Sequence, residues 1–156
     1  MGQITPFLWF DTEAEDAARF YTSVFPNSKI TKVTTRPDRP ERTVMTVEFE
    51  LDGERITALN GGPQFSFTEA FSFSVDCRTQ DEVDTYWSTL AEGGEEGPCG
   101  WLKDRFGLSW QVVPEALPRL LADPDPEKAQ RVFAAMMKMR KIDIAELERA
   151  AEGVAV

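Results

Sequence analysis

The sequence predicts an α+β fold in which one unit, a strand followed by a helix and then further strands, occurs twice. An apolar run of strand length at Ile4–Asp11 comes before a helical pattern at Glu13–Phe25, and three strand-like segments follow. The same order restarts with the alternating segment Ala70–Cys77 and the helical pattern at Thr79–Ala91. Two copies of such a unit indicate paired βαβββ modules that share a core, with helices after them.

The first copy contains clear helix and turn signals. Thr12 is expected to cap its helix, and Pro26-Asn27 to end it. The turn Asp52-Gly53 predicts a hairpin between the last two strands. The three strands after the helix are expected at Lys29–Thr35, Val44–Leu51 and Arg55–Asn60.

The second copy places polar residues on one face of its first and last strands. Alternation puts Ser72 and Ser74 on the face opposite the two phenylalanines of the same strand. The last strand, Leu108–Val113, has Trp110 directed toward the helix and a single amide, Gln111, beside it in the sequence.

The tail differs from both copies because it predicts helices only. These are expected at Pro114–Ala122 and Pro126–Arg140, and Asp143 is expected to cap a third helix. The middle helix has a wide, methionine-rich apolar face, which either covers the domain's own sheet or packs on a second subunit. The predicted organisation is paired modules at 1–114 (about 1–65 and 66–114) and a helical extension at 115–156, within one structural domain.

Composition excludes several classes of function. There are 17 Lys and Arg against 27 Asp and Glu, a formal charge of −10, so neither nucleic acid nor an anionic membrane is an expected partner. No apolar run approaches the roughly 20 residues that span a bilayer, and the first residues lack a signal-peptide pattern. Cys77 and Cys99 form no disulfide framework, which favours reduced thiols in a cytoplasmic protein.

Five motifs carry a family resemblance across almost the whole chain. In order they are ITPFLWFD, ARFYTSVFPNS, ALNGGPQFSFTEAFSFSV, GWLKDRFGLSWQVVP and AAMMKMRKIDIAELERA. Together they resemble the vicinal oxygen chelate (glyoxalase/bleomycin-resistance) superfamily, and within it the PhnB-like branch known by the name 3-demethylubiquinone-9 3-methyltransferase. The resemblance implies curved mixed sheets that jointly enclose a cavity, commonly completed by formation of a homodimer.

The metal chemistry implied by the resemblance does not match the residues present. Metal-binding members take histidine or glutamine and glutamate ligands from the first and last strands of each half. Those positions hold Thr5 or Pro6, the strand Ile56–Asn60 without a carboxylate, Ala70 and Gln111, and the chain has no histidine. One neutral amide does not hold a divalent ion, so the sequence predicts neither a metal nor another cofactor.

The methyltransferase name also implies a methyl-donor site, which normally uses a glycine-rich turn between a strand and a helix. Gly61-Gly62-Pro63 follows a strand, but it leads into an aromatic, strand-like run rather than a helix. S-adenosylmethionine is therefore not an expected ligand.

An aromatic cleft with a few polar groups is the predicted binding site. Alternation within Val44–Leu51 directs Glu48 away from the helix, where it is the only candidate general base; alternatively it lies solvated at a sheet edge. The resemblance gives Gln111 a ligand position, so it is expected on the same face as Ser72 and Ser74. Phe7 and Trp9 are expected on the cavity side of the first strand. The predicted ligand contacts are Phe7, Trp9, Asn60, Ser72, Ser74, Trp101 and Gln111.

The functional prediction is a cytoplasmic, homodimeric PhnB-like protein with a metal-free aromatic cavity that binds a small apolar or planar organic molecule. The first alternative is a metal-dependent enzyme of the glyoxalase or dioxygenase type. The second is a methyltransferase, as the family name implies. The residues leave open whether any reaction is catalysed.

Overall fold

The computed structural model describes residues 2–39 and 41–154. It divides the chain into two compact units, Met1–Phe67 and Thr68–Val156. Among the described residues, each helix is too short or too polar to cross a lipid bilayer.

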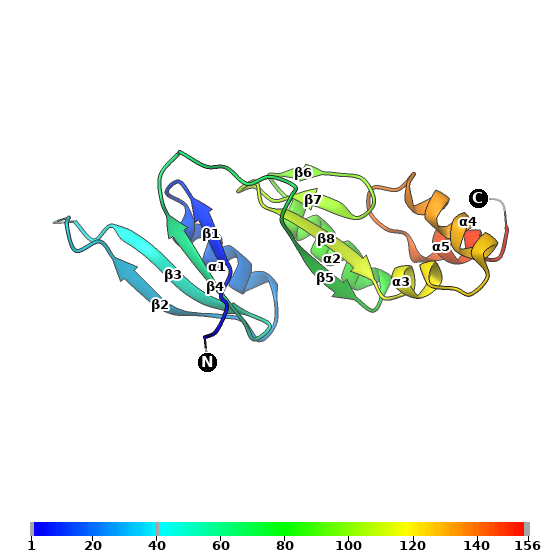
Figure 1. The fold of residues 1–156 in the computed structure, drawn as a ribbon, viewed down its shortest axis with the longest axis horizontal. Helices are drawn as coiled ribbons and strands as arrows, with labels where there is room; N and C mark the ends of the chain where they lie inside the picture. Colours follow the sequence, from blue (N-terminus) through cyan, green and yellow to red (C-terminus); the bar gives the residue numbers. More distant parts are fainter. Residues whose placement is uncertain (1, 40, 155–156) are drawn as a thin grey trace. The chain divides into compact units, whose positions relative to one another are not determined.

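Both units have the predicted βαβββ order (Figure 1). The first unit comprises β1 (Phe7–Phe10), α1 (Ala14–Val24), β2 (Lys29–Thr35), β3 (Val44–Leu51) and β4 (Glu54–Asn60). The second comprises β5 (Ser72–Cys77), α2 (Gln80–Ala91), β6 (Glu95–Glu96), β7 (Trp101–Lys103) and β8 (Ser109–Pro114). The α+β fold with two mixed four-stranded sheets is therefore confirmed.

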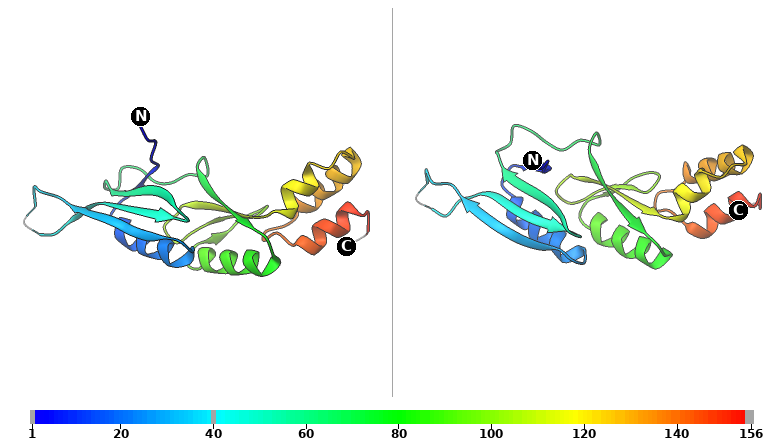
Figure 2. Two further views of the ribbon diagram at one scale, coloured as in Figure 1. Left: turned by 90° about the horizontal axis from the view of Figure 1, so that it is seen from below. Right: turned by 60° about the horizontal axis from the view of Figure 1, so that its bottom comes forward.

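The two sheets have equivalent strand orders, β1-β4-β3-β2 and β5-β8-β7-β6. In each, the first and last strands of the unit pair in parallel and the other neighbours are antiparallel. Each unit's helix lies on one face of its own sheet (Figures 1 and 2). The face opposite the helix is called the open face below.

The core of the first unit lies between α1 and its sheet. Val47, Phe49 and Leu51 of β3 are buried on the helix side, as alternation predicts. Each such side chain contributes about 1.5–3 kcal/mol through burial of apolar surface. The β1 strand begins at Phe7, later than the predicted Ile4, because Ile4 is 95% exposed and has no core to enter.

The start of α1 corrects one prediction. Thr12 does not cap the helix. Glu13, the residue directly before α1, occupies the capping position and makes no side-chain cap hydrogen bond. Instead, Asn60 Oδ1 at the end of β4 accepts a hydrogen bond from the Ala14 N–H at 2.8 Å. A neighbouring strand therefore supplies the acceptor that the helix start requires.

In the second unit, α2 is capped locally and packs on β8. The Thr79 side chain accepts from the Glu82 N–H, and Trp87 and Leu90 lie in the core with Trp110 and Val112. The Trp87 indole N–H also donates to Glu96 Oε1 at 2.8 Å, which ties α2 to β6.

A buried carboxylate holds the turn between β7 and β8. Asp104 is 2% exposed. Its Oδ1 accepts from the N–H groups of Phe106 and Leu108, and its Oδ2 accepts from the Trp110 indole N–H at 2.8 Å. This network fixes Trp110 toward α2, and the next residue, Gln111, consequently lies on the open face.

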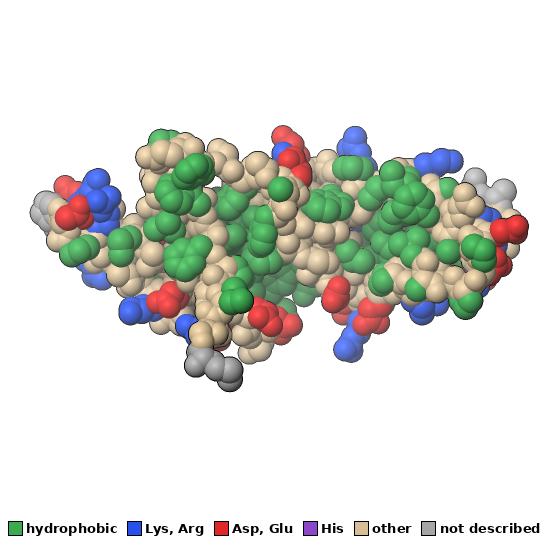
Figure 3. All heavy atoms as spheres, viewed as in Figure 1, with side chains coloured by type: hydrophobic (Ala, Val, Ile, Leu, Met, Phe, Trp, Pro, Cys, Tyr) green, Lys and Arg blue, Asp and Glu red, His purple; other side chains and the backbone are tan. Residues whose placement is uncertain are grey.

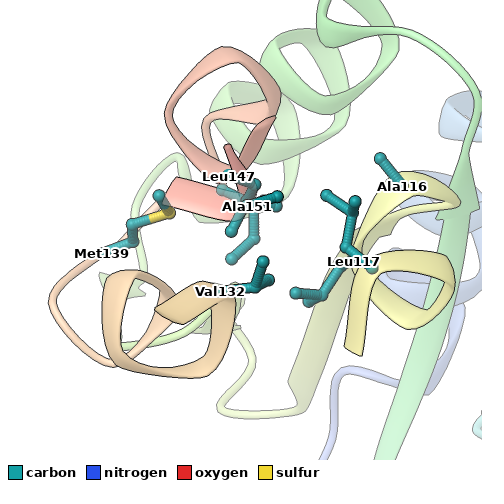
Figure 4. Packing of buried hydrophobic residues seen from close by; sticks show 8 residues of the cluster. Ala116, Leu117, Val132, Met139, Leu147 and Ala151 are labelled. Carbon is teal, nitrogen blue, oxygen red and sulfur yellow. The ribbon is translucent and has the colours of Figure 1, made fainter. Parts of the chain in front are cut away.

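Three C-terminal helices form their own hydrophobic cluster: α3 (Ala116–Leu121), α4 (Pro126–Met136) and α5 (Ile144–Ala151). Leu117 of α3, Val132 of α4 and Leu147 of α5 point toward one another (Figure 4). The apolar face of α4 therefore meets the other tail helices, and the expectation that it covers the sheet was wrong. Packing on a second subunit stays a prediction for its exposed residues Phe133 and Met137.

The loop after α4 explains why that helix ends before the predicted Arg140. Met139 turns back into the tail cluster. Its carbonyl accepts a hydrogen bond from the Cys99 N–H, and the Arg140 carbonyl accepts one from the Gly100 N–H, both at 2.8 Å. The side chain of Gln80 in α2 adds hydrogen bonds to the Ile142 carbonyl and the Ile144 N–H. These contacts join the extension to the second unit.

Candidate functional site

The open face of the second unit gathers polar residues from three strands. Register places Ser72 beside Ser109 and then Lys103, and it places Ser74 beside Gln111 and then Trp101. The predicted grouping of Ser72, Ser74 and Gln111 on the face away from α2 is confirmed. Trp101 was also predicted as a ligand contact, and it lies next to Gln111.

Gln111 is oriented by one hydrogen bond. Its Nε2 donates to Ser72 Oγ at 3.1 Å. Its Oε1 has no hydrogen-bond partner among the residues that the structure describes. Because the side chain is only partly buried, this oxygen can accept from a molecule placed on the sheet.

A hollow of about 220 Å³ lies beside this row of residues. Its wall includes Trp101 of β7, the acidic side chains Glu69 and Glu95, and Lys103. Lys103 and Glu69 form an ion pair, which raises the pKa of the lysine and lowers that of the carboxyl group. The hollow is smaller than most drug-binding pockets, so it suits one end of a small molecule.

Ser109 is the most unusual residue of the hollow. It is 1% exposed, and its hydroxyl has no hydrogen-bond partner among the described residues. An unpartnered buried hydroxyl costs about 1–3 kcal/mol, and native structures contain few of them. Its neighbour in the lining, Lys103, instead forms an ion pair with Glu69.

Phe7 and Trp9 lie on the open face of the first unit, as predicted. Phe7 is 62% exposed, whereas Trp9 packs against Gly61 and donates from its indole N–H to the Gly62 carbonyl at 2.9 Å. A Cβ at Gly61 would lie 2.3 Å from the indole ring, so only glycine fits there. The glycine pair therefore accommodates Trp9 and leads into Pro63 without a helix.

Glu48 also lies on the open face of the first unit, and it is partly buried. Its register partners are Lys32 on β2 and Thr57 on β4. The alternation that predicted its direction is confirmed, while its proposed role as a general base stays a prediction.

Asn60 lies on the helix side of β4, away from these residues. Besides capping α1, it donates from Nδ2 to the Val44 carbonyl at 3.1 Å. Both ends of its amide are thus used within the unit, and its ligand contact stays a prediction. It also lines a hollow of about 470 Å³ with the start of α1 and the two arginines Arg36 and Arg39.

The donor set for a metal ion does not fit the implied shell. Among the described residues, no group of three or more His, Cys, Asp or Glu side chains is placed to hold a metal ion. Ala70, at one of the four implied positions, lies before β5 begins. The register partner of Gln111 on β5 is Ser74 rather than Ala70, and the Gln111 amide nitrogen donates a hydrogen bond to Ser72.

Sequence reasoning missed Ser109, Lys103 and Glu69. The family resemblance assigned Gln111 to the open face, and alternation from that position also assigns Ser109, two residues earlier, to the same face. The contact between Lys103 and Glu69 had no such signal, because Glu69 lies in the irregular segment before β5.

Comparison with known proteins places the chain in a family. A family model described as 3-demethylubiquinone-9 3-methyltransferase matches residues 2–113. Among curated proteins, none matches the chain.

Similar folds occur among solved structures. The PhnB protein from Bacillus cereus is 34% identical, with a TM-score of 0.65 and coverage of 72% of this chain and 99% of that one. Protein PA1353 from Pseudomonas aeruginosa is 22% identical, with a TM-score of 0.62 and coverage of 74% and 98%. The fosfomycin resistance protein FosX from Mesorhizobium loti is 14% identical, with a TM-score of 0.57 and coverage of 78% and 98%.

The FosX likeness supports the fold alone, whereas the family model covers most of the chain and ends just before α3. The chain belongs to the family described as 3-demethylubiquinone-9 3-methyltransferase, and the PhnB protein from Bacillus cereus is a similar solved structure at 34% identity.

Proposed function

We propose that this protein binds a small, planar organic molecule on the open face of its second unit, without a metal ion. The observation that carries the proposal is the pair formed by Gln111 and Trp101, which are register partners on β8 and β7. They combine an aromatic surface with a hydrogen-bonding amide at the same place. Such a combination is typical of sites that bind small organic molecules.

The amide gives direction to the proposed site. Because Nε2 of Gln111 is held by Ser72, the amide has one preferred orientation, and Oε1 is the atom left to accept from a ligand. An oriented acceptor costs little entropy on binding, since the side chain is already ordered. A ligand with an N–H or O–H on an aromatic ring would meet both Gln111 and Trp101.

Three further predictions belong to this proposal. Phe7 and Trp9 are the aromatic candidates of the first unit, and the protein is expected to act as a cytoplasmic homodimer. We expect a binding role rather than a catalytic one, because the described polar residues of the open face include no nucleophile paired with a base.

The test is a screen of uncharged aromatic fragments by saturation-transfer NMR, followed by titration of the tightest fragment. Gln111→Leu should weaken its binding about tenfold, which corresponds to roughly 1.4 kcal/mol. Asp76→Asn is the matched control, since Asp76 is exposed on β5 at the far end of the same sheet. Unchanged binding in Gln111→Leu would contradict the proposed site.

Metal analysis and calorimetry test the alternatives. Stoichiometric zinc, nickel, manganese or iron in purified protein would overturn the metal-free proposal and favour an enzyme of the glyoxalase or dioxygenase type. Measurable binding of S-adenosylmethionine would favour methyl transfer, as the family name implies. If any turnover is found, Glu48→Gln should abolish it, and unchanged turnover would exclude Glu48 as the base.

A further inference from the structure

The hollow beside Ser109 has an excess of negative charge. Two carboxylates on the open face, Glu69 and Glu95, line it with one cation, Lys103, whereas Glu96 turns its carboxylate to the Trp87 indole on the helix side. Lys103 forms its ion pair with Glu69. Glu95 is the register partner of Lys103 and its charge helps to raise the pKa of that lysine, but it forms no ion pair with any residue in the described part of the chain. The hollow therefore disfavours an anionic ligand and favours a cationic one.

Ser109 supplies an independent sign that the hollow accommodates a polar group. Its buried hydroxyl lacks a partner among the described residues, although the neighbouring strand residues Ser72 and Lys103 both have one. A hydroxyl oxygen accepts hydrogen bonds, so an N–H group in the hollow would satisfy it.

Trp101 supplies the third element of the site. Its half-buried side chain lines the same hollow. The face of an indole attracts a positively charged group through the negative potential above its ring. An aromatic wall, the Glu95 carboxylate and a hydroxyl acceptor form a set that matches a planar organic cation.

We infer that the hollow binds the protonated end, an amidinium or ammonium group, of a small planar molecule. In this arrangement Glu95 pairs with the charge, Ser109 Oγ accepts from an N–H, and the ring extends along Trp101 toward Gln111. This inference rests on the proposed function and specifies its ligand class. The Glu69 carboxylate is the second available partner when Lys103 moves aside.

Benzamidine and benzamide are the probes, because they share shape and differ in charge. Titration at low ionic strength should give at least tenfold tighter binding of benzamidine, and this preference should fall as salt is added. Glu95→Gln should reduce the preference several-fold. The control Glu92→Gln removes an equal charge from the exposed end of α2, outside the hollow, and should leave the preference unchanged.

Ser109→Ala separates a ligand role from a structural one. It should weaken benzamidine several-fold while leaving the urea midpoint of unfolding equal or higher, because it removes an unpartnered buried hydroxyl. A lower midpoint together with unchanged benzamidine binding would show that Ser109 only supports the fold.

The outcomes distinguish this inference from the proposed function. Equal affinity for the two probes, with both weakened by Gln111→Leu, would overturn the charge preference and leave the proposed function standing. A preference for benzamidine that survives Glu95→Gln and Ser109→Ala would place the cation elsewhere and overturn the inference. Failure of both probes and of every neutral fragment would reject the site altogether.

Discussion

The equivalent hairpins of the two units use an aspartate in opposite ways. Between β3 and β4, Asp52 and Gly53 form a two-residue turn with φ angles of 47° and 84°, and Asp52 is exposed. Between β7 and β8, Asp104 is buried and its carboxylate accepts three hydrogen bonds. The first turn depends on backbone conformation, whereas the second depends on one charged side chain.

This difference matters because β8 carries the proposed site. Asp104 directs Trp110 into the core, and the alternation of the strand then sets Ser109 and Gln111 on the open face. In the first unit, polar atoms at the end of the corresponding strand are used by the fold, since Asn60 caps α1. The two units therefore share a topology but leave different polar groups available for a ligand.

The largest expected effect tests the two aspartates directly. Asp104→Asn should lower the free energy of unfolding by about 3 kcal/mol, because an amide has one acceptor oxygen and its NH₂ opposes a donor. Asp52→Asn should change it by less than about 0.5 kcal/mol, because asparagine also tolerates a positive φ in such turns. Urea unfolding followed by circular dichroism measures both.

The same pair of variants shows whether the hairpin supports the site. Asp104→Asn should also weaken fragment binding at Gln111 in protein that remains folded, whereas Asp52→Asn should not. Equal losses of stability in the two variants would contradict the contrast between the hairpins.

A smaller effect is expected at the starts of the two helices. Asn60→Ala should cost about 1–2 kcal/mol, because the Ala14 N–H loses its acceptor and the Val44 carbonyl loses a donor. Asn60→Asp keeps the acceptor for the helix and should recover part of this loss. Thermal unfolding compares them.

Two threonines provide matched controls for Asn60. Thr12→Ala should be nearly neutral, since Thr12 does not cap α1, whereas Thr79→Ala should cost about 1 kcal/mol at the start of α2. A larger loss for Thr12 than for Asn60 would restore the cap predicted from the sequence.

The sequence predicted most of the fold because its signals are local. Alternation set the faces of β3, β5 and β8, and Asp143 was recognised as the cap of α5, where it accepts from the Glu146 N–H. The cap of α1 was missed because Asn60 is 46 residues away from Ala14 and no local pattern joins them. Glu69 was missed for the same reason, since it lies in the irregular segment before β5 and its partner Lys103 lies much later in the sequence, on β7.

For the candidate site, the sequence could predict only which residues share the open face of the second sheet. Alternation indicates which residues lie on the same side of a strand, so it grouped Ser72 and Ser74, and the family resemblance added Gln111. It does not indicate which of them have hydrogen-bond partners. The unpartnered hydroxyl of Ser109 and the occupied amide of Asn60 depend on distances between strands, which only the structure supplies.

The smallest expected effect concerns the extension, which joins α2 and has no counterpart on α1. Asp84 of α2 accepts from Gln80 and pairs with Lys141 at 2.8 Å, and these contacts lower the pKa of its carboxyl group from the ordinary 3.8. A lowered pKa in the folded state stabilises the protein above about pH 4, and this contribution is lost as the pH falls through the folded value. Because the pair is largely exposed, this contribution to the free energy of unfolding amounts to a few tenths of a kcal/mol.

Asp84→Asn should therefore lose slightly less stability than the parent between pH 6 and pH 3, measured as urea midpoints. Gln80 still has an acceptor in this variant, because the asparagine side chain keeps one oxygen. A larger loss of stability than in the parent over this pH range would show that the charge on Asp84 does not hold the extension to α2.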